Sequence, residues 1–434
     1  MKKRMIAVLL SMLLVTGLLS GCGNSDNKKA ESKDEVTELT LLVDNANALN
    51  VGFKAVTELA EKEIGIKINV ETRPSGTDGD NMVKTRLASG DMTDLLVYNS
   101  GALLNAMNPE EYFIDISQED FSNRLDDSYK KAVSVNDAVF GVPYQSSQAE
   151  AIMYSKPMYE KYKLEIPKTW DEFLKNCDVL KEAGETAILG TFADAWTAQI
   201  PYLGDAYNLT LKVPDFAEKF DAGEAKWATT PEALNSFEKL ADTTPYYNED
   251  YLATTYDAGC DIMANGGAGH WFILSKALTN IYGLYEDMEI VDNLGFFPIP
   301  DDNPDENGMT LWYPPAIYGN KNSENQEAIL KFMEFYISDK ALDAYCEAAL
   351  PDGPFCVKDY ELPEKSYKAV SNDIQPYFDN GKTAPALEYV SQVKGVDCPA
   401  ICQELASGQT TAVEAAEKYD KDCEKQAKQL GLNW

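Results

Sequence analysis

Apolar and polar positions alternate between two periods along the first hundred residues. Leu39 to Val43 form a short apolar run that predicts a buried strand. Apolar side chains then recur every three or four residues from Leu49 to Ile64, which predicts a helix that ends at Gly65. The pattern continues with a strand at 66–70, a polar-rich helix at about 78–89 and a strand at 94–98. This order predicts an α/β fold with a parallel sheet and helical crossovers.

Later helices are marked by residues that cap a helix start. Thr169 and Glu172 have the spacing of a capping box, in which hydroxyl and carboxylate satisfy free backbone amides. Ser323 to Gln326 and Thr411 to Glu414 repeat this spacing, and Pro231 follows Thr230 as a first helical residue. Helices are therefore predicted to begin near 170, 231, 324 and 412. No internal repeat is present.

The beginning of the chain has the layout of a secretory signal. Met1-Lys2-Lys3-Arg4 is cationic, and the mainly apolar run from Met5 to Leu19 is short for a membrane span, which needs about 20 residues. Leu19-Ser20-Gly21-Cys22 resembles a bacterial lipobox, whose cysteine is acylated and becomes the new N-terminus. We therefore predict a signal peptide at 1–21 and a lipidated Cys22. A membrane-spanning anchor is the alternative.

The residues after Cys22 cannot form a packed core, because 23–35 contain no apolar side chain larger than alanine. We interpret 22–36 as the lipidated cysteine and a flexible tether. The protein is thus expected to be exported and held at the outer face of the cell membrane by its N-terminal lipid, with a globular body in solution. A body of about 400 residues exceeds one typical hydrophobic core, so two domains are expected.

Strong acidity narrows the range of partners. Without the signal, 35 basic side chains face 71 acidic ones, a net charge near −36. Such a surface makes nucleic acid an improbable partner, since nucleic-acid binding depends on cationic contacts to phosphates. Polyanionic solutes are disfavoured by the overall field, whereas neutral and cationic ligands stay open.

Neither a metal site nor a cofactor site is expected. Beyond Cys22 the chain has an odd number of cysteines, and bridges Cys346–Cys356 and Cys398–Cys423 are left open. Cys398 and Cys402 would need two further zinc ligands. The turn at 303–308 resembles a calcium loop, but its twelfth position is Pro314 instead of a bidentate glutamate.

An enzyme is the first rival class. The chain has no nucleophile-elbow, zinc-protease or phosphate-loop motif, and His270 is its only histidine. A triad that needs histidine and a multi-histidine metal site are therefore both unsupported. An extracellular glycoside hydrolase with a carboxylate pair is the remaining enzymatic alternative.

Several segments together resemble the extracellular solute-binding proteins of ABC importers, the family that includes maltose-binding protein. The resemblance is carried by Ala88–Leu95, Phe140–Tyr144, Met153–Lys156, Ile166–Phe173, Gly269–Trp271, Leu294–Pro300 and Asn325–Ser338. It departs at Ser155, where the family usually has Asn, and at Thr93, where it has Pro. The likeness covers nearly the whole chain after the tether.

This resemblance implies two α/β lobes of the type II periplasmic-binding-protein fold, joined by a hinge. The first lobe is expected at 37–146 plus a return segment at 296–316, and the second at 147–295 plus 317–434. Ligand would lie in the cleft, and the lobes would close on it by hinge motion. The implied partners are a small-molecule carbohydrate and the ABC transporter permease subunits, and we expect a monomer.

A sugar site needs flat aromatic rings for the sugar faces and amide or carboxylate groups for the hydroxyls. Open α/β sheets bind ligands at the carboxyl ends of their strands. Together with the family resemblance, this predicts a ligand set of Asp44, Asn45, Asn47, Tyr98, Asn99, Tyr144, Gln145, Asp194, Trp196, Trp271, Trp312 and Tyr313. Trp170 and Trp227 lie within helical patterns and are interpreted as packing residues.

The cargo is the least determined part. A peptide, a polyamine or a modified sugar could occupy the same fold, and the protein could present its ligand to a membrane sensor instead of a permease. A cationic cargo would favour several carboxylates in the cleft, and Asp44 and Asp194 provide two. The abundance of aromatic and amide groups favours an oligosaccharide.

Overall fold

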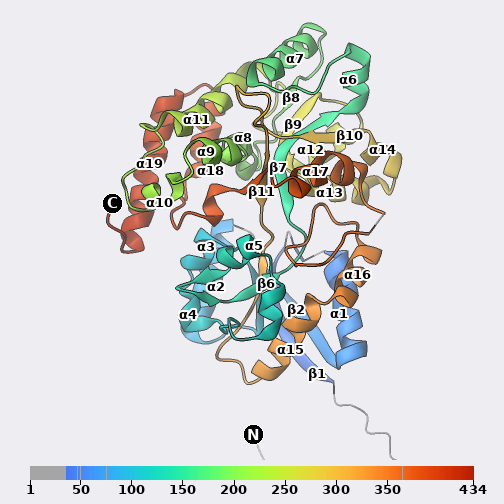
Figure 1. Ribbon diagram of the computed structural model, residues 1–434, viewed down its shortest axis with the longest axis vertical. Coiled ribbons are helices and arrows are strands. Elements are labelled where there is room, and N and C mark those ends of the chain that lie inside the picture. The colour runs from blue at the N-terminus through green and yellow to red at the C-terminus, as the bar shows by residue number, and fades with distance from the viewer. Residues whose placement is uncertain (1–35, 46, 49, 75, 364) are drawn as a thin grey trace, which may run out of the picture. The chain divides into compact units, whose positions relative to one another are not determined.

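The structure is a computed structural model that describes residues 36–45, 47–48, 50–74, 76–363 and 365–434. The predicted signal peptide, Cys22 and nearly all of the predicted tether lie outside these residues. Val36–Trp434 form one compact unit. Figure 1 shows its strands and helices along the chain.

The strands are β1 (Thr37–Asp44), β2 (Ile66–Arg73), β3 (Leu95–Tyr98), β4 (Ser134–Val135), β5 (Ala138–Val139), β6 (Gly141–Pro143), β7 (Gln148–Ser155), β8 (Ile188–Leu189), β9 (His270–Leu274), β10 (Leu294–Phe297), β11 (Met309–Trp312), β12 (Ala316–Gly319) and β13 (Thr383–Pro385). The α-helices are α1 (Val51–Ile64), α2 (Gly76–Ser89), α3 (Ala102–Asn105), α4 (Pro109–Tyr112), α5 (Asp127–Ala132), α6 (Lys156–Tyr162), α7 (Trp170–Glu182), α8 (Ile200–Leu203), α9 (Ala206–Lys212), α10 (Phe216–Asp221), α11 (Pro231–Thr243), α12 (Tyr256–Ala264), α13 (Lys276–Tyr285), α14 (Met288–Asp292), α15 (Gln326–Tyr336), α16 (Asp339–Ala348), α17 (Gln375–Asp379), α18 (Cys398–Ala406) and α19 (Ala412–Gln429). A π-helix spans Ala369–Ile374, and short 3-10 turns lie at Asp120–Arg124, Ala195–Gln199, Thr244–Tyr246 and Leu387–Tyr389.

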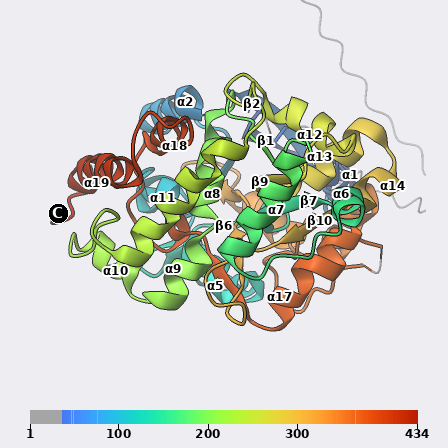
Figure 2. The same ribbon diagram turned by 90° about the horizontal axis from the view of Figure 1, so that it is seen from above.

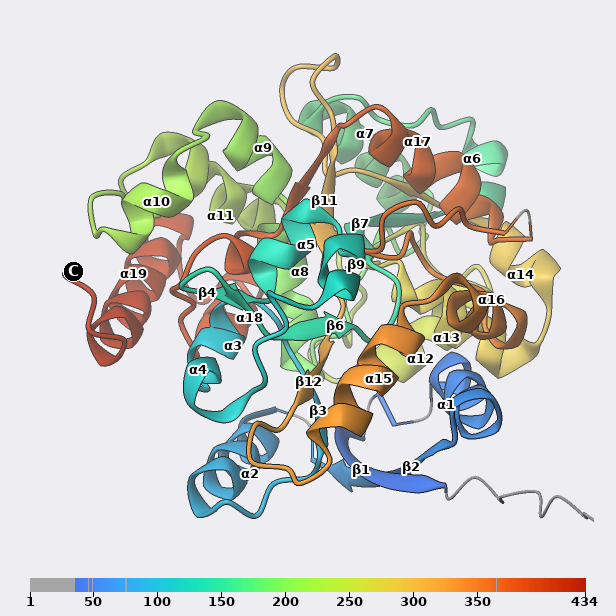
Figure 3. The ribbon, with the colours of Figure 1, turned by 60° about the horizontal axis from the view of Figure 1, so that its bottom comes forward.

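The first lobe is built on a sheet with the strand order β2-β1-β3-β12-β6. Strands β1, β2 and β3 are parallel, as the alternation of apolar strands and helices predicts, and β12 runs antiparallel to β3 and β6. Helices α1, α15 and α16 supply buried apolar side chains to the core of this lobe. Figure 3 shows α15 and α16 beside α1, although they lie far apart in the sequence.

The second lobe is built on a mixed sheet with the order β13-β11-β7-β9-β8, and β10 also pairs with β7. Strand β8 runs parallel to β9, so both end at the same edge. Helices α11, α18 and α19 pack together and bury a separate apolar core, and they lie near one another in Figure 2. The observed two-lobe α/β architecture agrees with the expected fold class.

The strand pairing corrects the expected lobe boundaries. The segment from 296 was expected to return to the first lobe, but β10 and β11 pair with β7 in the second lobe. The chain returns only after Trp312, where β12 joins the first sheet. The core of the first lobe includes residues up to Val357 and also Ala386 and Tyr389. The apolar run at 294–300 has the composition of a buried strand. Because buried strands of both sheets share this composition, the run does not reveal its lobe.

Most of the predicted helix ends and starts agree with the structure. Gly65 ends α1 with the left-handed backbone (φ 67°) that glycine tolerates, and α11 begins at Pro231. The box Thr411–Glu414 at α19 is complete. Thr169 caps α7, but Glu172 accepts from the amide of Lys168 instead.

The box predicted at Ser323 is not formed. Helix α15 begins at Gln326 with Asn325 as its capping residue, so it starts later than predicted. The hydroxyl of Ser323 donates to Asp94 at 2.6 Å, a tertiary bond that the local spacing does not reveal.

All seven cysteines of the described residues are free and buried, so neither bridge left open by the sequence is formed. Trp170 (6% exposed) and Trp227 (2%) are buried packing residues, as predicted.

Candidate functional site

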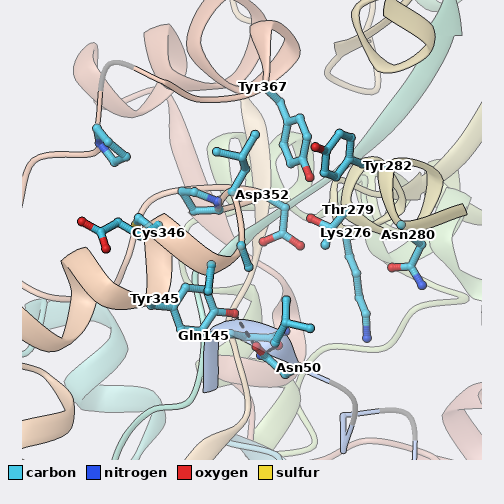
Figure 4. Close-up of a pocket in the computed structure, with 18 of the residues that line it drawn as sticks. Asn50, Gln145, Lys276, Thr279, Asn280, Tyr282, Tyr345, Cys346, Asp352 and Tyr367 are labelled. Atoms are coloured by element: carbon cyan, nitrogen blue, oxygen red, sulfur yellow. Dashed lines mark hydrogen bonds between the residues drawn. The ribbon is translucent and has the colours of Figure 1, made fainter. Parts of the chain in front are cut away.

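A cavity of about 920 Å³ is lined by residues of both lobes. The first lobe contributes the start of α1 and the end of α16, and the second lobe contributes α13. The first crossing between the lobes, at 144–147, and the segment after α16 complete the lining. The polar and aromatic side chains of the lining are Asn47, Asn50, Gln145, Lys276, Thr279, Asn280, Tyr282, Glu286, Asp343, Tyr345, Glu347, Asp352, Lys365 and Tyr367. Figure 4 shows most of them.

The wall from the first lobe is a set of fixed amides. Asn50 caps α1 by accepting a hydrogen bond from the amide of Phe53 at 2.9 Å. Its side-chain nitrogen donates to the hydroxyl of Tyr345 at 2.9 Å and lies 3.4 Å from the side-chain oxygen of Gln145. The β1–α1 loop is held further by Asn47, which donates to Asp44 at 2.8 Å. These amides are therefore held in place before any ligand binds.

The wall from the second lobe is one face of α13. Its capping residue Ser275 is fully buried and bonds the backbone on both sides, donating to the carbonyl of Asp352 at 2.7 Å and accepting from the amide of Ala149 at 3.0 Å. Lys276 and Asn280 then face the cavity, one helical turn apart. Because α13 follows β9 directly, these side chains lie at the carboxyl end of a strand.

Asp352 is the buried carboxylate of the cavity. Ser146 donates to one carboxylate oxygen at 2.5 Å and Gln148 lies 3.4 Å from the other. Burial raises the pKa of Asp352 to about 6, against the hydrogen bond from Ser146 and the positive charge of Lys276, which both lower it. This pKa lies about two units above that of an ordinary aspartate, in the mildly acidic range.

Two predicted ligand residues, Asn47 and Gln145, line the cavity. Tyr144 is fully buried behind it. Its hydroxyl donates to the carbonyl of Asn47 at 3.0 Å and its ring packs on Phe53 at 5.0 Å, so it supports the loop. Asn45 is exposed at the same loop.

Tyr98 and Asn99 follow the end of β3. The ring of Tyr98 is buried beneath the guanidinium of Arg73, whose centre lies 5.3 Å from the ring centroid. Asn99 is exposed, and its backbone carbonyl accepts a hydrogen bond from Tyr318 at 3.0 Å. Neither residue lines the cavity.

Asp194, Trp196 and Trp271 form a second cluster in the second lobe. Tyr256 joins them: its amide donates to Asp194 at 2.7 Å, and its ring lies 5.3 Å from Trp196 and 5.5 Å from Trp271. Trp196 is 36% exposed, whereas Trp271 is 1% exposed and donates to Thr191 at 3.3 Å. Trp196 is thus the accessible ring of this cluster.

Trp312 and Tyr313 lie at the second crossing with Tyr389. The ring of Tyr389 is 5.3 Å from Trp312 and 5.0 Å from Tyr313. Lys394, which pairs with Glu388, lies 5.5 Å from the centroid of Trp312. The predicted residues thus fall into four groups, and only the group at the β1–α1 loop and the first crossing borders the cavity.

Sequence reasoning missed most of the cavity lining. Lys276 follows β9, an apolar run for which no strand was predicted from the sequence. With that strand recognised, the rule that selected Asp44 also selects Lys276, since both lie at carboxyl ends of strands. Tyr345, Asp352 and Tyr367 offered no such signal, because the segment that carries them was assigned wholly to the second lobe.

His270 is a packing residue. It is fully buried, its ring contacts Phe173 and Tyr159, and its Nδ1 lies 2.9 Å from the carbonyl oxygen of Ala187. Burial lowers its pKa to about 4, so the ring is neutral at pH 7. Among the described residues, no group of three or more His, Cys, Asp or Glu side chains is placed to hold a metal ion.

None of the helices in the described part of the chain has the length and apolar character needed to cross a membrane.

Residues 46–343 match the sequence profile of the bacterial extracellular solute-binding protein family. The multiple sugar-binding protein of Streptococcus mutans is 27% identical over 185 residues, which are 42% of this chain and 43% of that protein. The melibiose/raffinose/stachyose-binding protein of Bacillus subtilis is 22% identical over 243 residues, 56% of this chain and 51% of that protein. The chain therefore spans about half the length of these relatives.

Solved structures show the same fold. A chitin oligosaccharide binding protein aligns with a TM-score of 0.76 and 19% identity, over 90% of this chain and 99% of that one. A sugar transporter of Bacillus licheniformis in complex with stachyose aligns with a TM-score of 0.69 and 19% identity, over 90% and 100% of the two chains. This likeness confirms the two-lobe fold predicted from the sequence.

Proposed function

Because the chain belongs to the bacterial extracellular solute-binding proteins, we propose that it is the substrate-binding component of an ABC importer and captures a carbohydrate between its lobes. The cavity between the lobes is the observation that carries this proposal. Its volume of about 920 Å³ suits a small ligand, and three tyrosines with four amide side chains line it. Relatives named for binding multiple sugars and raffinose-type oligosaccharides support an oligosaccharide as the cargo.

Because residues of both lobes line the cavity, a bound ligand can close the two lobes on each other. A ligand favours the closed arrangement only through contacts that it makes better there, so it must touch both lobes. Asn50 and Tyr345 offer amide and hydroxyl groups from the first lobe, and Lys276 and Asn280 offer donors from the second. The exposed ring of Trp196 is a further stacking surface for a longer sugar.

The predicted export and anchoring belong to the same proposal. A lipid on Cys22 would hold the body at the outer face of the membrane, where the permease subunits receive the sugar. The body is expected to act as a monomer with no cofactor and no metal, and the family assignment supports a binding role without catalysis.

A cationic cargo such as a polyamine is the second candidate, because four carboxylates and two ammonium groups line the cavity. Three of these carboxylates, Glu286, Asp343 and Glu347, are exposed at the rim and remain hydrated. Only Asp352 is buried, and Lys276 opposes its charge. The interior of the cavity therefore favours a neutral ligand.

Thermal unfolding of Val36–Trp434 with a panel of neutral oligosaccharides, peptides and polyamines tests the proposal. A site filled to 100 times its dissociation constant adds about 2.7 kcal/mol of stability, so one oligosaccharide should raise the midpoint by several degrees. Asn280→Ala should reduce the rise, and Asn372→Ala, at an exposed residue outside the cavity, should leave it unchanged.

A rise that only peptides or polyamines produce would contradict the carbohydrate assignment and leave the binding role intact. Trp196→Ala separates the two candidate surfaces. If this variant loses the response while Asn280→Ala keeps it, the sugar binds at the tryptophan cluster instead of the cavity.

A further inference from the structure

Asp352 lies where the ligand cavity meets the connection between the lobes. It is 8% exposed and follows α16, the last helix of the first lobe before the chain approaches the second lobe. The next residue, Gly353, approaches the crossing so closely that an added Cβ would lie 2.2 Å from the carbonyl oxygen of Ser147. The two segments are therefore packed backbone against backbone.

The side chain of Asp352 joins residues on both sides of this contact. Its carboxylate accepts from Ser146, which lies in the crossing from β6 to β7, and faces Gln148, the first residue of β7. Its backbone carbonyl accepts from Ser275, the capping residue of α13. One residue thus connects the crossing strand, the wall from the second lobe and the cavity.

We propose that Asp352 is a positioning residue that couples occupancy of the cavity to the conformation of the first crossing. The ligand part rests on the proposed function. The oxygen that faces Gln148 makes the longer contact, 3.4 Å, and retains acceptor capacity toward the cavity. A sugar hydroxyl that donates to this oxygen holds the carboxylate and, through Ser146, the crossing strand in one arrangement.

The charge of this carboxyl is set by groups from every element around it. Lys276 on α13 favours the ionised form, and the hydroxyl of Ser146 stabilises it by hydrogen bonding. Tyr256, Tyr345 and Tyr367 are neutral neighbours. Burial opposes ionisation and brings the pKa to about 6, so mild acid protonates the carboxyl and converts one acceptor into a donor.

Hydrogen exchange on the ligand-free protein tests the coupling independently of the cargo. The amide of Ser147 bonds to the carbonyl of Pro354 at 2.8 Å, and that of Ala149 bonds to Ser275 at 3.0 Å. After correction for the intrinsic pH dependence, the protection of these two amides should change by about threefold or more between pH 5 and pH 7.5. Asp352→Asn should abolish this change.

Glu334→Gln is the matched control, because it removes an exposed carboxylate on α15 of the first lobe, outside the cavity and away from the crossing. It should keep the wild-type response. A flat profile in the wild-type protein overturns the proposal, and so does an equal loss in both variants.

Calorimetry at pH 6 in buffers of different ionisation enthalpy tests the ligand part. Binding of the sugar should exchange a fraction of a proton with the buffer in the wild-type protein and in Glu334→Gln, but none in Asp352→Asn. If no sugar binds while the exchange profile depends on Asp352, the proposed cargo fails and the role of Asp352 at the crossing stands. If a sugar binds with neither response, the coupling is overturned and the proposed function stands.

Discussion

His270 shows how burial outweighs a hydrogen bond in setting the pKa of a single residue. Its pKa is lowered to about 4 in the folded protein, so the unfolded chain, with a pKa near 6.5, binds the proton more readily. The contribution of this histidine to the free energy of unfolding is therefore constant above pH 6.5 and decreases as the pH drops toward 4. Because each tenfold change in proton affinity is worth about 1.4 kcal/mol, the loss by pH 4 is about 3 kcal/mol.

This prediction has a direct readout, since His270 is the only histidine of the sequence. Its Hε1 proton should give one NMR signal that does not shift between pH 8 and pH 5.5. A midpoint near 6.5 would show that the ring is solvated in the folded protein.

For single residues, the sequence predicted the chemical role of a side chain better than it predicted whether that side chain is exposed. The sequence correctly separated Trp170 and Trp227 as packing residues, because both lie within helical patterns. It could not predict that Trp271 is covered by Tyr256 while Trp196 stays exposed. The covering ring lies 15 residues away in the chain, and nothing local to either tryptophan specifies that contact.

Helix starts carry the clearest prediction at the scale of elements. In the complete capping box of α19, the hydroxyl of Thr411 accepts from the amide of Glu414 at 3.3 Å, and the carboxylate of Glu414 accepts from the amide of Thr411 at 3.1 Å. Thr411→Ala should lower the free energy of unfolding by about 1 kcal/mol, as measured by urea titration. Thr410→Ala, one residue before the cap, removes only the 3.3 Å hydrogen bond from the Thr410 hydroxyl to Glu414 and should change it by less than half as much.

Three segments of the sequence have the spacing of a capping box, and the three helices that follow them begin in three different ways. The box at Thr411 formed because both side chains are exposed and the hydrogen bonds between them stay at the helix start. The hydroxyl of Ser323 instead donates to Asp94, more than 200 residues away in the chain, and Asn325 takes the capping position. Capping motifs therefore predict that a helix begins nearby, and tertiary hydrogen bonds decide the residue.

For the whole molecule, the order of strands and helices in the first hundred residues predicted the parallel part of the first sheet. The assignment of later segments to lobes was less successful. Strand β10 and strand β12 are both short, buried and apolar, yet they belong to different sheets. The lobe to which a strand belongs depends on which sheet has an edge strand free to pair with it. That information comes only from the complete topology. For the same reason, the sequence did not predict that the segment with Asp352 lies at the cavity.

The two-sided cavity makes a final prediction about the whole molecule. If a sugar bridges the lobes, hydrogen exchange should slow in the first turn of α1, which Asn50 caps, and in the first turn of α13, which Ser275 precedes. Both changes should follow the same saturation curve, because closure depends on contacts with both lobes. The amides of α19 lie in a separate core and serve as the control. Slowing in only one of the two helices would show that the ligand binds one lobe without closing the other over it.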